Sequence, residues 1–146
     1  MPIVDENRMI VKYGLTMLQN TQRLGLMALI EAANNGSNPN VRAVVENKPK
    51  QSKPKTINST YIGFTLAPRI NAAGRLDNAE IAVKLFTEND PKSALEIAEY
   101  LCELNSKRQS IENEIMQDAI KIIEEHELNS KHSVLVLWKK GWHSGV

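Results

Sequence analysis

The stretch PKSALEIAEYLCELNSKRQSIENEIMQDAIKIIEEHEL, residues 91–128, decides the architecture predicted for this chain of 146 residues. Apolar residues recur along it at intervals of three and four, and no Gly or Pro follows Pro91, which is the pattern of a helix. Such a helix is roughly 55 Å long, more than a small core needs. Residues 105–113 are largely polar on all sides, as expected where a helix crosses solvent. We therefore predict a long helix that connects two domains.

Shorter helices are predicted on the N-terminal side of this connector. Residues 6–20 carry apolar side chains at helical spacing, and Asp5 or Asn7 is the expected cap. A second helix is predicted over residues 24–33, and the turn-forming run NNGSNPN, residues 34–40, ends it.

A basic loop is predicted over residues 38–60. It contains three prolines and few apolar residues after Val45, and its lysines are Lys48, Lys50, Lys53 and Lys55. Either the loop is a solvated connection, or it is an arm that follows a phosphate backbone. A short helix capped by Thr56 or Ser59 is expected at its end, and another, capped by Asp77 or Asn78, is expected to run to Phe86.

The run SVLVLW, residues 133–138, is continuous and apolar, with β-branched residues. This pattern favours a buried strand. A single strand cannot satisfy its own hydrogen bonds, so we expect the chain to be a piece of a longer protein or of a broken reading frame.

The composition limits the function classes. Hydrophobic residues make up 42% and charged residues 24%, whereas aromatic residues make up only 5%, so an aliphatic core is expected. A net charge of +1 argues against a uniformly basic nucleic-acid binder but allows a local basic site. The single cysteine, Cys102, excludes an internal disulfide and favours a reducing, cytoplasmic location. No apolar run approaches the roughly 18 residues that span a bilayer.

The stretch APRINAAGR, residues 67–75, concentrates residues suited to phosphate contact. Pro68 is expected to push Ala67 towards extended backbone, and Gly74 permits a turn or a close backbone approach. Arg69 and Arg75 carry fork-shaped donors that fit phosphate oxygens, and Asn71 can hydrogen-bond a phosphate, a base or the backbone. The alternative is a structural turn in which the arginines bond carbonyls or carboxylates.

The stretch GWHSGV, residues 141–146, follows the predicted strand and can serve as a functional loop. His143 can donate to a phosphate, Ser144 adds a donor, and the amides around Gly145 can bind an anion. The alternative is an ordinary turn in which Trp142 packs. The three histidines of the chain show no metal-ligand spacing, and no complete catalytic set is present.

Together, ENRMIVKYGLTML, GFTLAPRINAAGRLDNAEIAVKLF, LNSKRQSIE and VLWKKGWHSGV occur in an order that resembles the RecJ-type single-stranded-DNA exonucleases of the DHH phosphoesterase superfamily. The resemblance covers the chain apart from residues 38–55. It implies a mainly α segment of an α/β parent. Its parts are residues 1–37 (end of the DHH domain), 38–60 (basic loop), 61–90 (PRINAAGR segment), 91–128 (connecting helix) and 129–146 (truncated start, with the first strand, of the DHH-associated domain).

The family implies metal-dependent hydrolysis of single-stranded DNA from a 5′ end, in DNA repair and recombination. Mn²⁺ or Mg²⁺ would bind in the parent but not in this segment, which lacks the Asp-His-His motif and is expected to be inactive alone. The implied partners are single-stranded DNA and the missing N- and C-terminal portions of the polypeptide. The implied phosphate contacts are Arg69, Asn71, Arg75, His143, Ser144 and Gly145.

Two alternatives stay open at this point. One is a DHH phosphodiesterase that cleaves small oligonucleotides or cyclic dinucleotides. The other is a fragment that binds single-stranded nucleic acid without catalysis.

Overall fold

The computed structural model describes residues 4–35, 57–128 and 134–146. The elements are α1 (Asp5–Gln19), α2 (Leu24–Asn35), α3 (Ser59–Tyr61), the π-helix η2 (Ile62–Leu66), α4 (Ala67–Leu76), α5 (Glu80–Thr87) and α6 (Pro91–Glu125). These ranges contain no strand. The prediction of a mainly helical segment is therefore confirmed. Residues 38–56 of the predicted basic loop lie outside the described ranges.

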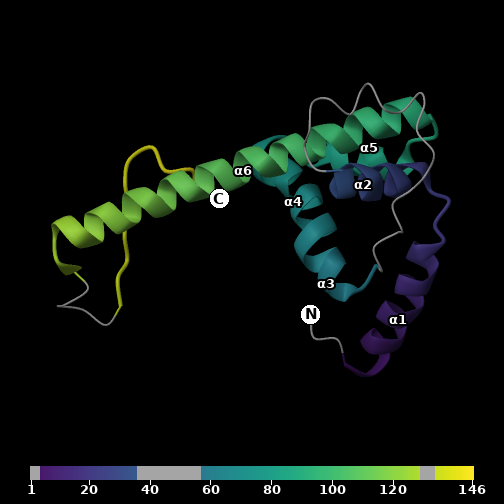
Figure 1. The fold of residues 1–146 in the computed structure, drawn as a ribbon, viewed down its shortest axis with the longest axis horizontal. Helices are drawn as coiled ribbons and strands as arrows, with labels where there is room; N and C mark the ends of the chain where they lie inside the picture. The colour runs from purple at the N-terminus through teal and green to yellow at the C-terminus, as the bar shows by residue number, and fades with distance from the viewer. Residues whose placement is uncertain (1–3, 36–56, 129–133) are drawn as a thin grey trace.

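The long helix α6 has 35 residues and two unlike halves. Asp90 caps it, because its Oδ2 accepts a hydrogen bond from the Ser93 amide at 2.8 Å, and Pro91 occupies the first turn as predicted. All of its buried residues lie between Ala94 and Asn105. Beyond Asn105 the helix extends away from the other helices (Figure 1). The periodic pattern therefore identified one helix that serves as core at one end and as a projecting arm at the other.

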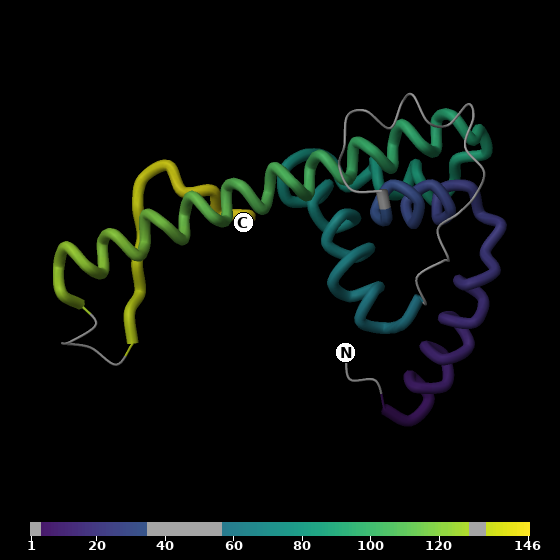
Figure 2. Tube along the Cα trace, in the orientation of Figure 1, coloured from purple at the N-terminus to yellow at the C-terminus, as the bar shows by residue number. Residues whose placement is uncertain are grey.

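The hydrophobic core lies between α2, α4, α5 and the first half of α6 (Figures 1 and 2). Leu29, Leu85 and Leu101 are fully buried at its centre. Alanines fill the contact between α4 and α6, and small side chains let two helices approach closely. These residues are Ala72, Ala73, Ala94 and Ala98. The core is aliphatic, as the composition predicted.

The helix pair α2 and α5 depends on Gly25. A Cβ atom added at Gly25 would lie only 1.8 Å from the Leu85 carbonyl oxygen and 2.7 Å from its carbonyl carbon. The obstacle is backbone, which cannot rotate away as a side chain can. Glycine is therefore required at this crossing.

The chain from Ser59 to Leu76 is helical throughout, and this corrects two predictions. Ala67 has helical angles (φ −59°, ψ −40°) and not the extended backbone expected before Pro68. The preceding π-helix explains this. Its wider turn bonds the Ala67 amide to the Ile62 carbonyl, five residues back. The wider turn accommodates a ring that would otherwise strike the preceding turn. Gly74 also lies inside α4 and forms no turn.

Helix capping differs from the sequence-based expectation at the starts of α1, α3 and α5. The N-cap of α1 is Val4, with no side-chain bond, so Asp5 and Asn7 lie inside the first turn. Asn58 caps α3 by accepting from the Tyr61 amide at 2.8 Å, in place of Thr56 or Ser59. Before α5, Asn78 Oδ1 accepts from the Glu80 amide at 2.9 Å, but the N-cap is Ala79, which makes no side-chain capping bond, in place of Asp77 or Asn78.

The prediction of a buried strand in the run SVLVLW is wrong for the part described. Residues 135–139 have no regular secondary structure, and the side chains of Val134, Val136 and Trp138 are 80%, 90% and 83% exposed. A strand needs a neighbouring strand for its backbone hydrogen bonds, and the described residues provide none. The run therefore has the apolar pattern of a buried strand, but the described residues contain no sheet in which it could be buried.

No helix in the described part of the chain is both long enough and apolar enough to span a bilayer.

Candidate nucleic-acid interface

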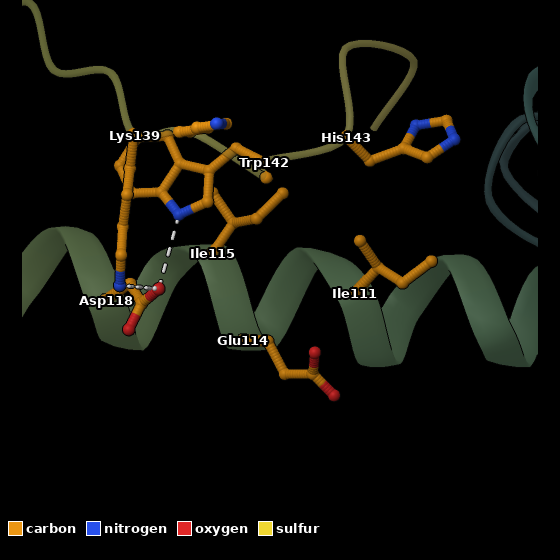
Figure 3. Close-up of a pocket in the computed structure, with 9 residues that line it drawn as sticks. Ile111, Glu114, Ile115, Asp118, Lys139, Trp142 and His143 are labelled. Atoms are coloured by element: carbon orange, nitrogen blue, oxygen red, sulfur yellow. Dashed lines mark hydrogen bonds and ion pairs between the residues drawn. The ribbon is translucent and has the colours of Figure 1, made fainter.

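The C-terminal segment, residues 134–146, runs beside the projecting half of α6 and is fixed to it at Asp118. Asp118 Oδ2 accepts a hydrogen bond from Lys139 Nζ at 2.7 Å and another from Trp142 Nε1 at 3.3 Å (Figure 3). Ile115 lies one turn earlier on α6, beneath the Trp142 indole (Figure 3). One carboxylate and one isoleucine therefore hold the segment by charge and by packing.

A pocket of about 300 Å³ separates this segment from α6. Its lining residues are Ile111, Glu114, Ile115, Asp118, Lys139, Lys140, Gly141, Trp142 and His143. Ile111 and Ile115 form its floor from the helix, while Lys139, Trp142 and His143 face it from the loop (Figure 3). Lysine, indole and imidazole groups therefore gather at one surface, a combination that suits a nucleic-acid strand.

The Asp118 contact predicts a pH response. Hydrogen bonds from Lys139 and then Trp142 lower the pKa of Asp118 below its ordinary value of 3.8. A lowered pKa in the folded state means that the contact stabilises above pH 3.8 and is lost as the pH falls through the lowered value. In a Trp138→Phe background, Trp142 emission should shift to the red over that acid range. Asp118→Asn should abolish this transition. An unchanged transition in the variant would assign it to another group.

The stretches APRINAAGR and GWHSGV meet directly. Arg75 Nη1 donates a hydrogen bond to the Gly145 carbonyl oxygen at 2.6 Å, across 70 residues of sequence. Arg75 lies in the last turn of α4 and is exposed. The structure thus brings together one residue of each candidate motif.

His143 is oriented by its own loop. The Gly145 amide donates to His143 Nδ1 at 3.0 Å, and the Val146 amide donates to the His143 carbonyl at 3.4 Å. Because Nδ1 accepts a hydrogen bond, the proton of the neutral ring is at Nε2. His143 is exposed, so this Nε2–H can donate to an anion.

Arg69 lies on a different side of α4 from Arg75. Its Nε donates to Cys102 Sγ at 3.3 Å, and its Nη1 donates to the Thr65 carbonyl. Burial raises the pKa of the Cys102 thiol, and the Arg69 guanidinium partly opposes that increase. These two hydrogen bonds support the structural interpretation, in which Arg69 bonds groups of the protein itself. Nη2 makes no hydrogen bond to the described residues, and it can serve a phosphate.

The remaining predicted site residues are exposed. Asn71 lies four residues before Arg75 and so on the same face of α4. Ser144 lies in the turn between His143 and Gly145. The structure therefore joins Arg75 to the C-terminal loop, leaves Arg69 against α6 and shows Asn71 exposed on the Arg75 face of α4.

The sequence interpretation missed Asp118 and Lys139. One signal was present, because Ile111, Ile115 and Asp118 have the spacing of a single helix face. No local pattern indicates that Lys139 pairs with Asp118.

The described residues contain no group of three or more histidine, cysteine, aspartate or glutamate side chains that could hold a metal ion. These described residues do not fit the divalent metal that the resemblance implies for the parent. We therefore assign no metal-dependent step to this chain.

Two curated relatives match nearly all of the chain. The single-stranded-DNA-specific exonuclease RecJ of Bacillus subtilis is 34% identical over 145 residues, which are 99% of this chain and 16% of the relative. The protein of the same name from Haemophilus influenzae is 34% identical over 148 residues, 99% of this chain and 23% of the relative. The chain thus spans less than a quarter of the length of either relative. No family model matches the chain.

Two solved structures match the chain and carry the same protein name as the sequence relatives. The crystal structure of RecJ in complex with Mn²⁺ from Thermus thermophilus superposes with a TM-score of 0.68 at 27% identity, over 99% of this chain and 18% of that one. The Mg²⁺ complex from the same organism gives 0.61 at 30% identity, over 81% and 16%. The chain therefore has the fold of a segment of a single-stranded-DNA exonuclease. The resemblance to the RecJ-type enzymes is confirmed over nearly the whole chain.

Proposed function

We propose that this chain is the DNA-contacting segment of a RecJ-like enzyme that hydrolyses single-stranded DNA from its 5′ end. The Arg75–Gly145 hydrogen bond carries the proposal. It unites the two stretches that the sequence offered as candidates for phosphate contact. The RecJ names of the relatives support the substrate class.

The proposed contacts follow from donor chemistry. His143 presents Nε2–H, and Asn71 and Ser144 add neutral donors. Arg69 offers Nη2 from the other flank of α4. Backbone phosphates carry one negative charge each, so such donors bind a strand without reading its sequence. The lysines of the predicted loop lie outside the described residues, so the interpretation of this loop as a phosphate-following arm stays a prediction.

The rest of the enzyme is proposed to be supplied by other parts of a longer polypeptide. Residues 1–37, 61–90 and 91–128 would then be the end of the first domain, the motif segment and the connecting helix, with residues 129–146 beginning the second domain. The Mn²⁺ or Mg²⁺ that would activate water belongs to the first domain in this proposal. A cytoplasmic role in DNA repair and recombination is part of the same proposal.

A substrate-length series tests this function. Fluorescence anisotropy should show that affinity for labelled oligothymidylate rises with strand length, exceeds affinity for duplex DNA and falls as salt increases. Stronger binding of a dinucleotide or cyclic dinucleotide would favour the small-oligonucleotide phosphodiesterases instead. Failure of the chain to bind labelled strands of any length would reject the proposal.

Turnover by the chain alone tests whether catalysis belongs to other parts of the polypeptide. The chain alone, supplied with Mn²⁺, is expected to bind single strands without hydrolysing them. Release of nucleotides by the chain alone would contradict the assignment of catalysis to other parts of the polypeptide.

A further inference from the structure

We propose that Arg75 is a positioning residue for His143 and not chiefly a phosphate contact. The Arg75 guanidinium donates a hydrogen bond to the Gly145 carbonyl oxygen and so holds Gly145 in place. The Gly145 amide in turn donates to His143 Nδ1 and so orients the imidazole. The inference rests on the proposed function in one respect, namely that His143 is the phosphate donor.

The first step is the bond from Arg75 to Gly145. At 2.6 Å, with a charged donor, it belongs to the stronger class of hydrogen bonds. Arg75 is also well placed to remain where it is, because a cation in the last turn of a helix interacts favourably with the helix dipole. Using Nη1 on a carbonyl leaves less of the fork for a bidentate phosphate contact.

The second step is the close packing of Gly145. A Cβ atom added there would lie 3.2 Å from the Arg75 carbonyl oxygen and 3.2 Å from His143 Cε1. Both distances are tighter than ordinary van der Waals contact. The glycine therefore lets both α4 and the imidazole approach the same residue closely.

The third step is the hydrogen bond from the Gly145 amide to His143 Nδ1, at 3.0 Å. The residue that carries this amide is held by Arg75 through its carbonyl. On the other side of His143, the loop is anchored by Lys139 and Trp142 at Asp118. His143 thus lies between two anchors, and Arg75 supplies the one nearer the chain end.

The test uses the ¹⁵N-labelled chain without DNA. At pH 8 the imidazole nitrogen shifts of His143, assigned with His143→Gln, should report the Nε2–H tautomer. Arg75→Ala should give a mixture of tautomers. Gly145→Val should give the same mixture while removing no charge. Arg108→Ala is the matched control, because Arg108 pairs with Glu112 on α6 and its loss should leave His143 unchanged.

Single-strand binding completes the test. Arg75→Ala and Gly145→Val should each weaken binding about fivefold, and adding His143→Ala to Arg75→Ala should weaken it little further, because coupled residues are not additive. Unchanged His143 shifts in Arg75→Ala, or full affinity in Gly145→Val, would overturn the inference. If the unaltered chain binds no single strand, the proposed function fails, yet the tautomer comparison still decides whether Arg75 positions His143.

Discussion

Gly25→Ala is expected to lower the free energy of unfolding by about 3 kcal/mol. The new Cβ would meet the Leu85 carbonyl oxygen at 1.8 Å. Relief requires α2 and α5 to separate, and that exposes the fully buried side chains of Leu29 and Leu85. Urea unfolding followed by circular dichroism in the far ultraviolet measures the change.

Gly14→Ala is the matched control. Gly14 lies in α1, and a Cβ atom there would have nothing within 4 Å. Alanine loses less backbone entropy than glycine in a helix, so this variant should gain roughly 0.5–1 kcal/mol. If both variants changed stability in the same direction, the close crossing of α2 and α5 would be contradicted.

Arg69→Ala is expected to lower kcat/KM on single-stranded DNA more than tenfold in a full-length enzyme that carries this segment. Tenfold corresponds to about 1.4 kcal/mol of transition-state stabilisation. The reason is the loss of Nη2 from the phosphate path. Steady-state kinetics on a long single strand, with the melting temperature measured in parallel, provides the comparison.

Cys102→Ala separates the two roles of Arg69. It removes the sulfur that accepts from Arg69 Nε and keeps the guanidinium. If Arg69 contacts phosphate, Cys102→Ala should retain most of the activity. If Arg69 serves only to join α4 to α6, the cysteine variant should lose activity and stability together with Arg69→Ala, and the phosphate assignment fails.

Local sequence patterns were sufficient for α1, α2 and α6 but not for α4. Spacing at three and four identified α1, α2 and α6 because the period of an amphipathic helix is visible in the chain itself. Pro91 marked the start of α6 because proline is favoured at the first helical position, and the structure adds Asp90 as its cap. These elements and the family resemblance together gave the prediction of a mainly helical segment.

Local sequence patterns could not predict contacts between residues that are far apart in the chain. The π-helix before Pro68 depends on how the widened turn packs, and the Arg75–Gly145 bond joins residues 70 positions apart. The run at residues 133–138 has the composition of a buried strand, yet burial needs partner strands that the described residues do not supply. The candidate site was therefore predicted as two separate motifs, and only the structure shows them in contact.

The most direct test of the central claim is the affinity of the chain for a labelled single strand before and after His143→Ala. The claim places a phosphate donor at His143 Nε2, so the variant should bind about tenfold more weakly. Arg108→Ala, which removes a cation engaged with Glu112, should bind as the unaltered chain does. Equal affinity of His143→Ala and the unaltered chain would contradict the claim.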